Sequence, residues 1–230
     1  MIEVTFYGHS AFLITIDGKK VLFDPFITPN DGAKSIDISK ISPDYILVSH
    51  GHADHVADVE EIAKQSGAML VSNFEIVSWF QKKGIENVHP MNHGGSKVFD
   101  FGKVKYVNAI HSSTLPDDSP GGNPGGFVVE TKHGSFYYAG DTALTYDMKL
   151  IGEEFSIDFA LLPIGDNFTM GIEDALKAAD FVGTDRVIGM HYDTFPYILL
   201  DKEQAQRKAL EAHKELILLE IGEKIILGNN

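Results

Sequence analysis

The chain has 230 residues, a formal net charge of −14, ten histidines and no cysteine. Its length allows a large core, and 43% hydrophobic with 23% charged residues is typical of a globular protein, which excludes disordered and collagen-like classes. The negative charge disfavours nucleic acid as a partner, because a polyanion would be repelled over most of the surface. Without cysteine, any metal would be held by imidazole and carboxylate groups.

The sequence contains no recognisable secretory signal, membrane span or interdomain linker. No window approaches the roughly 18 uninterrupted apolar residues of a membrane span, and the first residues lack the basic and apolar regions of a secretory signal. We therefore expect a cytoplasmic protein with no membrane partner. No proline- or serine-rich linker divides the chain, so residues 1–230 are predicted to form a single domain.

Alternating apolar residues predict strands at the start of the chain. Residues 2–6 alternate apolar and polar side chains, which is the pattern of a half-buried strand. Two further apolar runs, 12–16 and 21–23, lie on either side of Asp17-Gly18, a dipeptide suited to a hairpin turn. The sequence therefore predicts an antiparallel meander.

Strands and helices alternate in the next segment. The continuous apolar run 45–48 is typical of a strand buried on both faces. Apolar residues at helical spacing then predict one helix over about 53–66, which Gly67 ends. A strand over 69–72 follows, and Asn73 is placed to cap a second helix.

The second half continues this alternation. Strands are predicted over 104–109, 126–131, 136–139, 158–163, 186–190, 216–219 and 224–227. A helix is expected around 172–182, and another begins near Asp201. Two β-rich halves that each carry helices predict an α/β protein with the architecture of a four-layer αββα sandwich.

One long stretch, Ser112–Gly125, has no periodic pattern and contains three prolines. Loops of this length in compact domains are uncommon unless they are functional or mobile. We therefore expect a flap over the functional site there.

Four nitrogen and oxygen ligands occur within six residues directly after a predicted strand: His50, His52, Asp54 and His55. A turn at a strand end lets such side chains converge on neighbouring metal positions. Neutral imidazoles leave the charge of a metal uncancelled, so it remains able to lower the pKa of bound water. The alternatives are a solvated polar loop or one structural metal, but structural zinc sites usually include thiolates.

The ordered motifs of the chain resemble those of the metallo-β-lactamase superfamily. Beyond the histidine-rich loop, the matching residues each follow a strand-like run, and they are Asp24 in Leu22-Phe23-Asp24-Pro25, His111 in Asn108-Ala109-Ile110-His111, Asp141 in Ala139-Gly140-Asp141-Thr142 and His191 in Ile188-Gly189-Met190-His191. Five segments narrow the resemblance to a branch of compact metal-dependent hydrolases, which is similar to the L-ascorbate-6-phosphate lactonases. They are Gly8-His9-Ser10-Ala11-Phe12, Gly140-Asp141-Thr142, Leu162-Pro163-Ile164-Gly165, Phe168-Thr169-Met170-Gly171 and Met190-His191-Tyr192-Asp193-Thr194-Phe195-Pro196.

The resemblance implies two divalent transition-metal ions, with zinc or manganese favoured and iron, cobalt or nickel also suited to nitrogen and oxygen ligands. It assigns one ion to His50, His52 and His111, and the other to Asp54, His55 and His191, with Asp141 bridging the two. Asp24 would accept a hydrogen bond from a ligand imidazole and fix its tautomer.

The implied activity is hydrolysis of a small ester, lactone or phosphodiester by a hydroxide that bridges the metals. The expected partner is a small molecule, including an anionic one, and the chain is open to forming a homo-oligomer. Asp54 would relay a proton. His9 is a candidate for substrate binding or proton transfer, with a hydrogen-bonded turn histidine as the alternative.

Six further positions stay open. His93 would either approach the site or lie in an exposed turn, and the turn is favoured. Asn167 and Thr169 belong to a loop that could face substrate. Three aromatic residues would either line a pocket beside His191 or pack as ordinary core residues, and they are Tyr192, Phe195 and Tyr197.

Three other functions compete with this interpretation. A nuclease or other phosphodiesterase acting on nucleic acid would use the same chemistry, but the acidity disfavours it. A flavodiiron redox protein typically has a carboxylate where this chain has His52. A metal-binding scaffold without activity is the third alternative, and the presence of every expected ligand argues against it.

Overall fold

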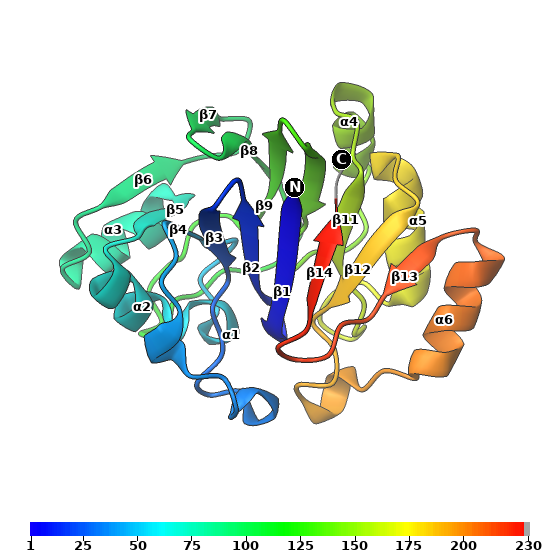
Figure 1. Cartoon of the computed structure of the whole chain (residues 1–230), viewed down its shortest axis with the longest axis horizontal. Helices are drawn as coiled ribbons and strands as arrows, with labels where there is room; N and C mark the ends of the chain where they lie inside the picture. Colours follow the sequence, from blue (N-terminus) through cyan, green and yellow to red (C-terminus); the bar gives the residue numbers. More distant parts are fainter. Residues whose placement is uncertain (228–230) are drawn as a thin grey trace.

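The computed structural model describes residues 1–227. Two seven-stranded sheets pack face to face, and helices cover both outer faces (Figure 1). This is the four-layer αββα sandwich that the sequence predicts. No helix within the described residues is both long and apolar enough to cross a bilayer.

The first sheet begins with the predicted antiparallel meander and ends in parallel strands. Its strands, in spatial order, are β14 (Lys224–Leu227), β1 (Ile2–Gly8), β2 (Ala11–Ile16), β3 (Lys19–Phe23), β4 (Tyr45–Leu47), β5 (Met69–Asn73) and β6 (Val88–Met91). The turn between β2 and β3 places Asp17 and Gly18 at positive φ, as an Asp-Gly hairpin turn requires. The helices on this side are α1 (Ala53–Val56), α2 (Val59–Ser66) and α3 (Phe74–Lys82).

The second sheet has parallel strands at one edge and antiparallel strands at the other. Its spatial order is β13 (Glu215–Ile217), β12 (Arg186–Met190), β11 (Phe159–Pro163), β10 (Gly134–Tyr138), β9 (Gly125–Thr131), β8 (Gly102–Asn108) and β7 (Ser96–Phe99). The helices on this side are α4 (Asp147–Glu154), α5 (Ile172–Val182) and α6 (Lys202–Glu211). The described residues also form three short 3-10 helices, which are η1 (Asp31–Ala33), η2 (Ile38–Lys40) and η3 (Pro196–Ile198).

Buried aromatic rings join the two sheets. Phe23 of β3 is fully buried, and its ring centroid lies 4.6 Å from that of Tyr138 and 6.1 Å from that of Phe136, both on β10. Burial of each such side chain contributes about 1.5–3 kcal/mol. Because this packing is dense, the sheets are fixed relative to one another and their strand ends meet at one edge.

Strand direction decides which loops share that edge. In the first sheet, β1, β3 and β4 run the same way, since β1 and β3 both pair antiparallel with β2 and β3 pairs parallel with β4. In the second sheet, β8, β10, β11 and β12 run the same way by the same logic. Every residue matched to a superfamily motif follows the carboxyl end of one of these strands.

The predicted helix over 53–66 is instead two helices, α1 and α2, separated at Asp58. The Asp58 carboxylate accepts hydrogen bonds from the backbone N–H groups of Ile27 (2.6 Å) and Thr28 (2.9 Å). The Asp58 N–H donates to the carbonyl of Pro25, also outside the helix. These bonds hold Asp58 at φ −102°, ψ 3°, which interrupts the helix.

Among the α-helices and strands, β6, β7 and α4 were not predicted. β6 contains Pro90, which weakens a strand pattern, and β7 is mostly exposed, so it lacks alternating apolar residues. In α4 only Met148 and Ile151 are buried, which is too few for a clear helical stripe.

Candidate metal centre

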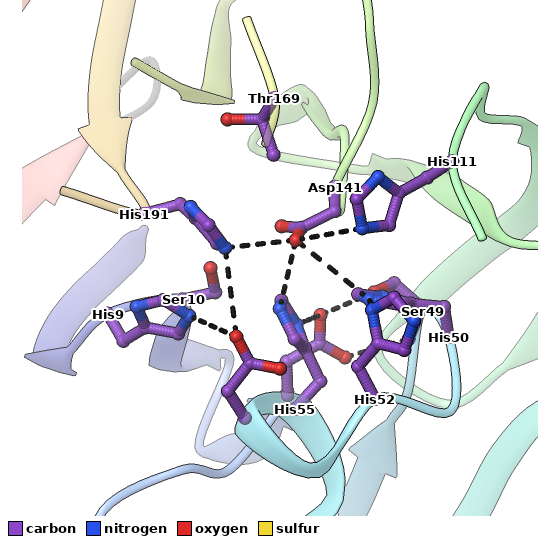
Figure 2. A network of polar contacts seen from close by, with 12 residues as sticks. His9, Ser10, Ser49, His50, His52, His55, His111, Asp141, Thr169 and His191 are labelled. Carbon is purple, nitrogen blue, oxygen red and sulfur yellow. Dashed lines mark hydrogen bonds and ion pairs between the residues drawn. The ribbon is translucent and has the colours of Figure 1, made fainter. Parts of the chain in front are cut away.

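The histidine-rich segment forms a loop and one helical turn after β4. His50 follows the strand and is fully buried, while His52 immediately precedes α1. Asp54 and His55 lie within α1, one residue apart. Figure 2 shows the side chains of His50, His52 and His55 turned towards the same space. These side chains converge because helix α1 begins directly after the loop that ends β4.

Asp141, in the loop after β10, stands at the centre of the site. Its Oδ2 atom lies 3.0 Å from Nε2 of His191, 3.4 Å from that of His55, 3.5 Å from that of His111 and 3.9 Å from that of His50. The Asp141 residue is only 2% exposed. One buried carboxylate oxygen is therefore surrounded by four imidazole nitrogens (Figure 2).

Candidate ligand atoms gather in three groups within the described residues, each with one atom per residue and all atoms within 4.8 Å of one another. One group is His50, His52 and His111, and another is His9, Asp54, His55 and His191. The third is Asp24, His50 and His55. The first two contain the residues that the resemblance assigns to the two metals. The structure thus brings together all seven residues assigned to metals by the resemblance. It also adds His9 to the second group.

Three atoms of the candidate ligands lack hydrogen-bond partners within residues 1–227. His55 Nε2, Asp141 Oδ1 and His191 Nδ1 are all buried and unpaired, and the first two belong to neighbouring ligands of the site. Buried polar groups normally find partners, so an unpaired nitrogen and an unpaired carboxylate oxygen in one site need an explanation. A bound cation would give both atoms a partner, and nitrogen and oxygen donors without thiolate suit a divalent transition metal. The residues present therefore fit the implied group.

Asp24, after β3, is fully buried and accepts four hydrogen bonds. Oδ1 accepts from the Ser49 N–H (2.7 Å), and Oδ2 accepts from Ser49 Oγ (2.5 Å), the Tyr138 hydroxyl (2.8 Å) and His55 Nδ1 (2.8 Å). When Nδ1 of His55 carries the donated proton, the lone pair of Nε2 is left facing Asp141. Sequence reasoning did not find Ser49 or Tyr138, although Ser49 precedes His50 and Tyr138 ends the strand before Asp141.

Burial and charge divide the site histidines into two kinds. Burial holds the pKa of His50 well below its usual value. For His55, burial acts in the same direction, but the carboxylates of Asp141, Asp24 and Asp54 outweigh it and raise the pKa well above its usual value. Burial likewise opposes ionisation of Asp141, yet His55 and His191 lower the pKa of this carboxyl well below its usual range. The site therefore favours a positive charge at its centre.

His9, after β1, is buried beside the second group of ligands. Its Nε2 lies 3.1 Å from Asp54 Oδ2, and its Nδ1 lies 2.9 Å from Thr194 Oγ1. Its ring centroid lies 4.2 Å from that of His191. Burial lowers the pKa of His9 to about 4, so the ring is neutral near pH 7. Thr194 is a further contact that sequence reasoning missed.

His93 supports a loop rather than the centre. Its Nε2 lies 2.9 Å from the Pro124 carbonyl, and its ring stacks on Tyr106 with centroids 5.0 Å apart. His133 lies elsewhere and pairs with Asp17 of the first hairpin.

The Ser112–Gly125 segment is a fixed wall and not the expected flap. Ser113 Oγ accepts a hydrogen bond from the Gly51 N–H (3.0 Å) and donates to the Gly121 carbonyl (2.9 Å). Asn73, at the start of α3, donates to the same carbonyl (2.7 Å), and Leu115 is 2% exposed. These contacts tie the segment to the histidine-rich loop.

Comparisons with known proteins agree with a hydrolytic metal centre on this fold. A family model described as a β-lactamase superfamily domain matches residues 3–191. A protein of Christiangramia forsetii described as a metal-dependent hydrolase is 58% identical, and one of Flavobacterium johnsoniae with the same description is 57% identical; each alignment covers 98% of this chain and all of the relative. The solved structure of a metallo hydrolase from the archaeon Ignicoccus hospitalis superposes with a TM-score of 0.88 at 34% identity, covering 97% of both chains.

Proposed function

The chain belongs to the metallo-β-lactamase superfamily, and from this premise we propose that it is a hydrolase that cleaves a small ester, lactone or phosphodiester with two divalent transition-metal ions. The observation that carries the proposal is the position of Asp141 Oδ2 within 3.9 Å of four imidazole nitrogens in a buried site. The printed description of the relatives as metal-dependent hydrolases supports it.

The two groups of ligand atoms suggest how the ions would be held. One ion would be held by His50, His52 and His111, and the other by Asp54, His55 and His191, with Asp141 facing both. Zinc or manganese suits this donor set. When bound, such ions lower the pKa of water and polarise a carbonyl or phosphoryl oxygen.

The protein's own residues would orient and tune this site. Asp24 fixes the tautomer of His55, which keeps Nε2 available. Burial raises the pKa of Asp54, but His55 and the hydrogen bond from His9 outweigh that effect, so the pKa is lowered and the carboxylate stays ionised.

His9 holds one oxygen of Asp54 in place. With Nε2–H donating to Asp54 Oδ2 and Nδ1 accepting from the Thr194 hydroxyl, both nitrogens of a neutral ring are satisfied. Asp54 Oδ1 is then the atom that takes a proton from the attacking water or returns one to the leaving group.

Charge supports a small substrate. The formal charge of −14 repels polyanions, whereas bound cations would attract a small anion to the centre. A lactone, an ester and a phosphodiester all present an electrophilic atom and an oxygen that such a site can polarise.

The experiment that tests this function is a substrate panel. The purified chain, loaded with zinc or manganese, is assayed on lactones, carboxylic esters, thioesters, phosphodiesters and phosphorylated sugars. We expect turnover of at least one class, and a loss of more than about 100-fold in His52→Ala and Asp141→Ala, since even partners of ligands contribute about 10- to 100-fold.

The matched control is His93→Gln, a histidine held outside the centre, which should retain most of the activity. Absence of turnover by the metal-loaded chain on every class would favour the non-catalytic scaffold. Oxygen consumption by an iron-loaded chain would instead favour the redox function.

A further inference from the structure

Exposed apolar side chains occur on the strand-end loops that carry the metal centre. Ile110, next to His111, is 51% exposed, Phe168 in the loop after β11 is 51% exposed, and Tyr197 in the loop after β12 is 73% exposed. A single exposed hydrophobic residue is ordinary. Here three follow strands that end at the same sheet edge, where His111, Asp141 and His191 also lie.

Two of these side chains touch one another. The ring centroids of Phe168 and Tyr197 lie 6.1 Å apart in an edge-to-face arrangement, and we call this pair the aromatic clamp. Thr169, the neighbour of Phe168, lies above His191 and Asp141 in Figure 2. Tyr197 shares a loop with Phe195, whose ring centroid lies 5.5 Å from that of His9. Along the chain, Phe168 is therefore adjacent to a residue that lies above the ligands, and Tyr197 is two residues from a ring that neighbours His9.

The loop that carries Phe168 is held in place. A Cβ added at Gly165 would lie 2.1 Å from the His191 carbonyl oxygen, so the two loops meet backbone to backbone. Gly165 also pairs with Gly171 across the loop. Between them Asp166 and Asn167 adopt φ values of 62° and 58°, a conformation that non-glycine residues disfavour. This strained tip presents the Phe168 ring to solvent.

Tyr197 is mounted as firmly. The next residue, Ile198, is fully buried, and its carbonyl accepts a hydrogen bond from the Asp193 N–H (2.8 Å). The Asp193 carboxylate in turn accepts from the Leu200 N–H (2.8 Å). An exposed aromatic ring therefore stands on a closed, anchored loop.

We propose that the aromatic clamp binds an uncharged aryl or alkyl group of the substrate, which makes the substrate of the proposed hydrolase an amphiphile with its scissile head at the metals. This inference rests on the proposed function. Ligand sites combine apolar walls with a few aimed polar groups, and rigid aromatic rings provide such walls without being ordered on binding. The exposed carboxylate of Asp166 at the same tip disfavours a second anionic group there.

The test compares ligands that share one head group. Methylphosphonate, hexylphosphonate and phenylphosphonate are titrated into the metal-loaded protein by calorimetry. We expect the hexyl and phenyl ligands to bind at least about tenfold more tightly than the methyl ligand, which is about 1.4 kcal/mol. In the double variant Phe168→Ala, Tyr197→Ala this preference should fall below about threefold, with methylphosphonate affinity unchanged.

Two further variants guard against trivial effects. Leu210→Ala removes another exposed apolar side chain, 76% exposed on α6, and should keep the full preference for hexyl- and phenylphosphonate over methylphosphonate. Phe168→Leu keeps an apolar side chain on the strained loop and should retain most of this preference.

The outcomes separate the two proposals. Binding of all three phosphonates with equal affinity overturns the aromatic clamp and leaves the proposed function standing. Failure of all three to bind the metal-loaded protein contradicts the anion-binding centre of the proposed function itself. If sedimentation shows that the double variant loses a dimer which the wild type forms, the aromatic clamp contacts a second copy of the chain and the inference is wrong.

Discussion

Replacing Asp24 with asparagine tests how the site is organised. The Oδ2 atom accepts hydrogen bonds from Ser49 Oγ, Tyr138 and His55 in the fully buried interior. An asparagine can keep the Oδ1 contact with the Ser49 N–H but would place an NH₂ group against those three donors. Two outcomes follow, one for stability and one for metal binding.

The magnitudes follow from the contacts. Removing the charge of a buried, hydrogen-bonded network typically costs 3–5 kcal/mol, so Asp24→Asn should lower the free energy of unfolding by about 4 kcal/mol. Tyr138→Phe removes one of the bonds and should cost only about 1.5 kcal/mol, because its single proton is shared with the Ser10 carbonyl, also 2.8 Å away.

Metal affinity should fall in parallel. Without the carboxylate, Nδ1 of His55 loses its acceptor, and the loss of such a partner weakens metal binding by about 10- to 100-fold. Urea unfolding of the chelated protein measures the first effect, and competition with a chromophoric chelator measures the second. Asp24→Asn with wild-type stability and wild-type metal affinity would refute the role given to Asp24.

Three further predictions concern neighbouring parts of the site. Burial keeps the pKa of His9 at about 4 in the folded protein, whereas the unfolded chain titrates near 6.5. Acidification therefore protonates the unfolded chain first, which favours unfolding. Between pH 7.5 and pH 4.5 the free energy of unfolding of the metal-free protein should fall by about 2.5 kcal/mol because of this group. In urea titrations at several pH values, His9→Gln should remove this part of the pH dependence of the free energy of unfolding. An unchanged pH dependence would contradict the role given to His9. Gly165→Ala should destabilise the protein by about 2 kcal/mol or more in the same assay, because the new Cβ would meet the His191 carbonyl; full stability would show that the loops can separate. The indole N–H of Trp79, the single tryptophan, donates a hydrogen bond to Asp117 of the fixed wall. Asp117→Ala should therefore shift the tryptophan fluorescence emission and leave the metal content unchanged. Identical emission would show that this contact does not form in solution.

Much of the fold could be predicted because its signals are local. The Asp17-Gly18 turn, the buried run of β4 and the Asn73 cap are each visible within a few residues, and the structure has all three, with Asn73 Oδ1 accepting from the Ile76 N–H. The break at Asp58 was missed because its partners lie about 30 positions earlier in the chain. Helical spacing contains no information about that contact.

The residues of the site likewise divide into those with a local sequence signal and those placed by contacts between distant parts of the chain. His50, His52, Asp54 and His55 could be found because they crowd into one loop, and the other motif residues because each follows a strand. Tyr138 and Thr194 could not, since their contacts with Asp24 and His9 span 114 and 185 positions. Such partners are chosen by the packing of the two sheets, which no short motif records.

The central claim is that the two groups of ligand atoms around Asp141 hold metal. Elemental analysis of the protein purified without chelators tests it most directly, with His52→Ala and Asp141→Ala alongside. We expect about two transition-metal ions per chain in the wild type, as in two-metal hydrolytic sites, and fewer in both variants. A wild-type chain without metal, or variants with an unchanged metal content, would contradict the account.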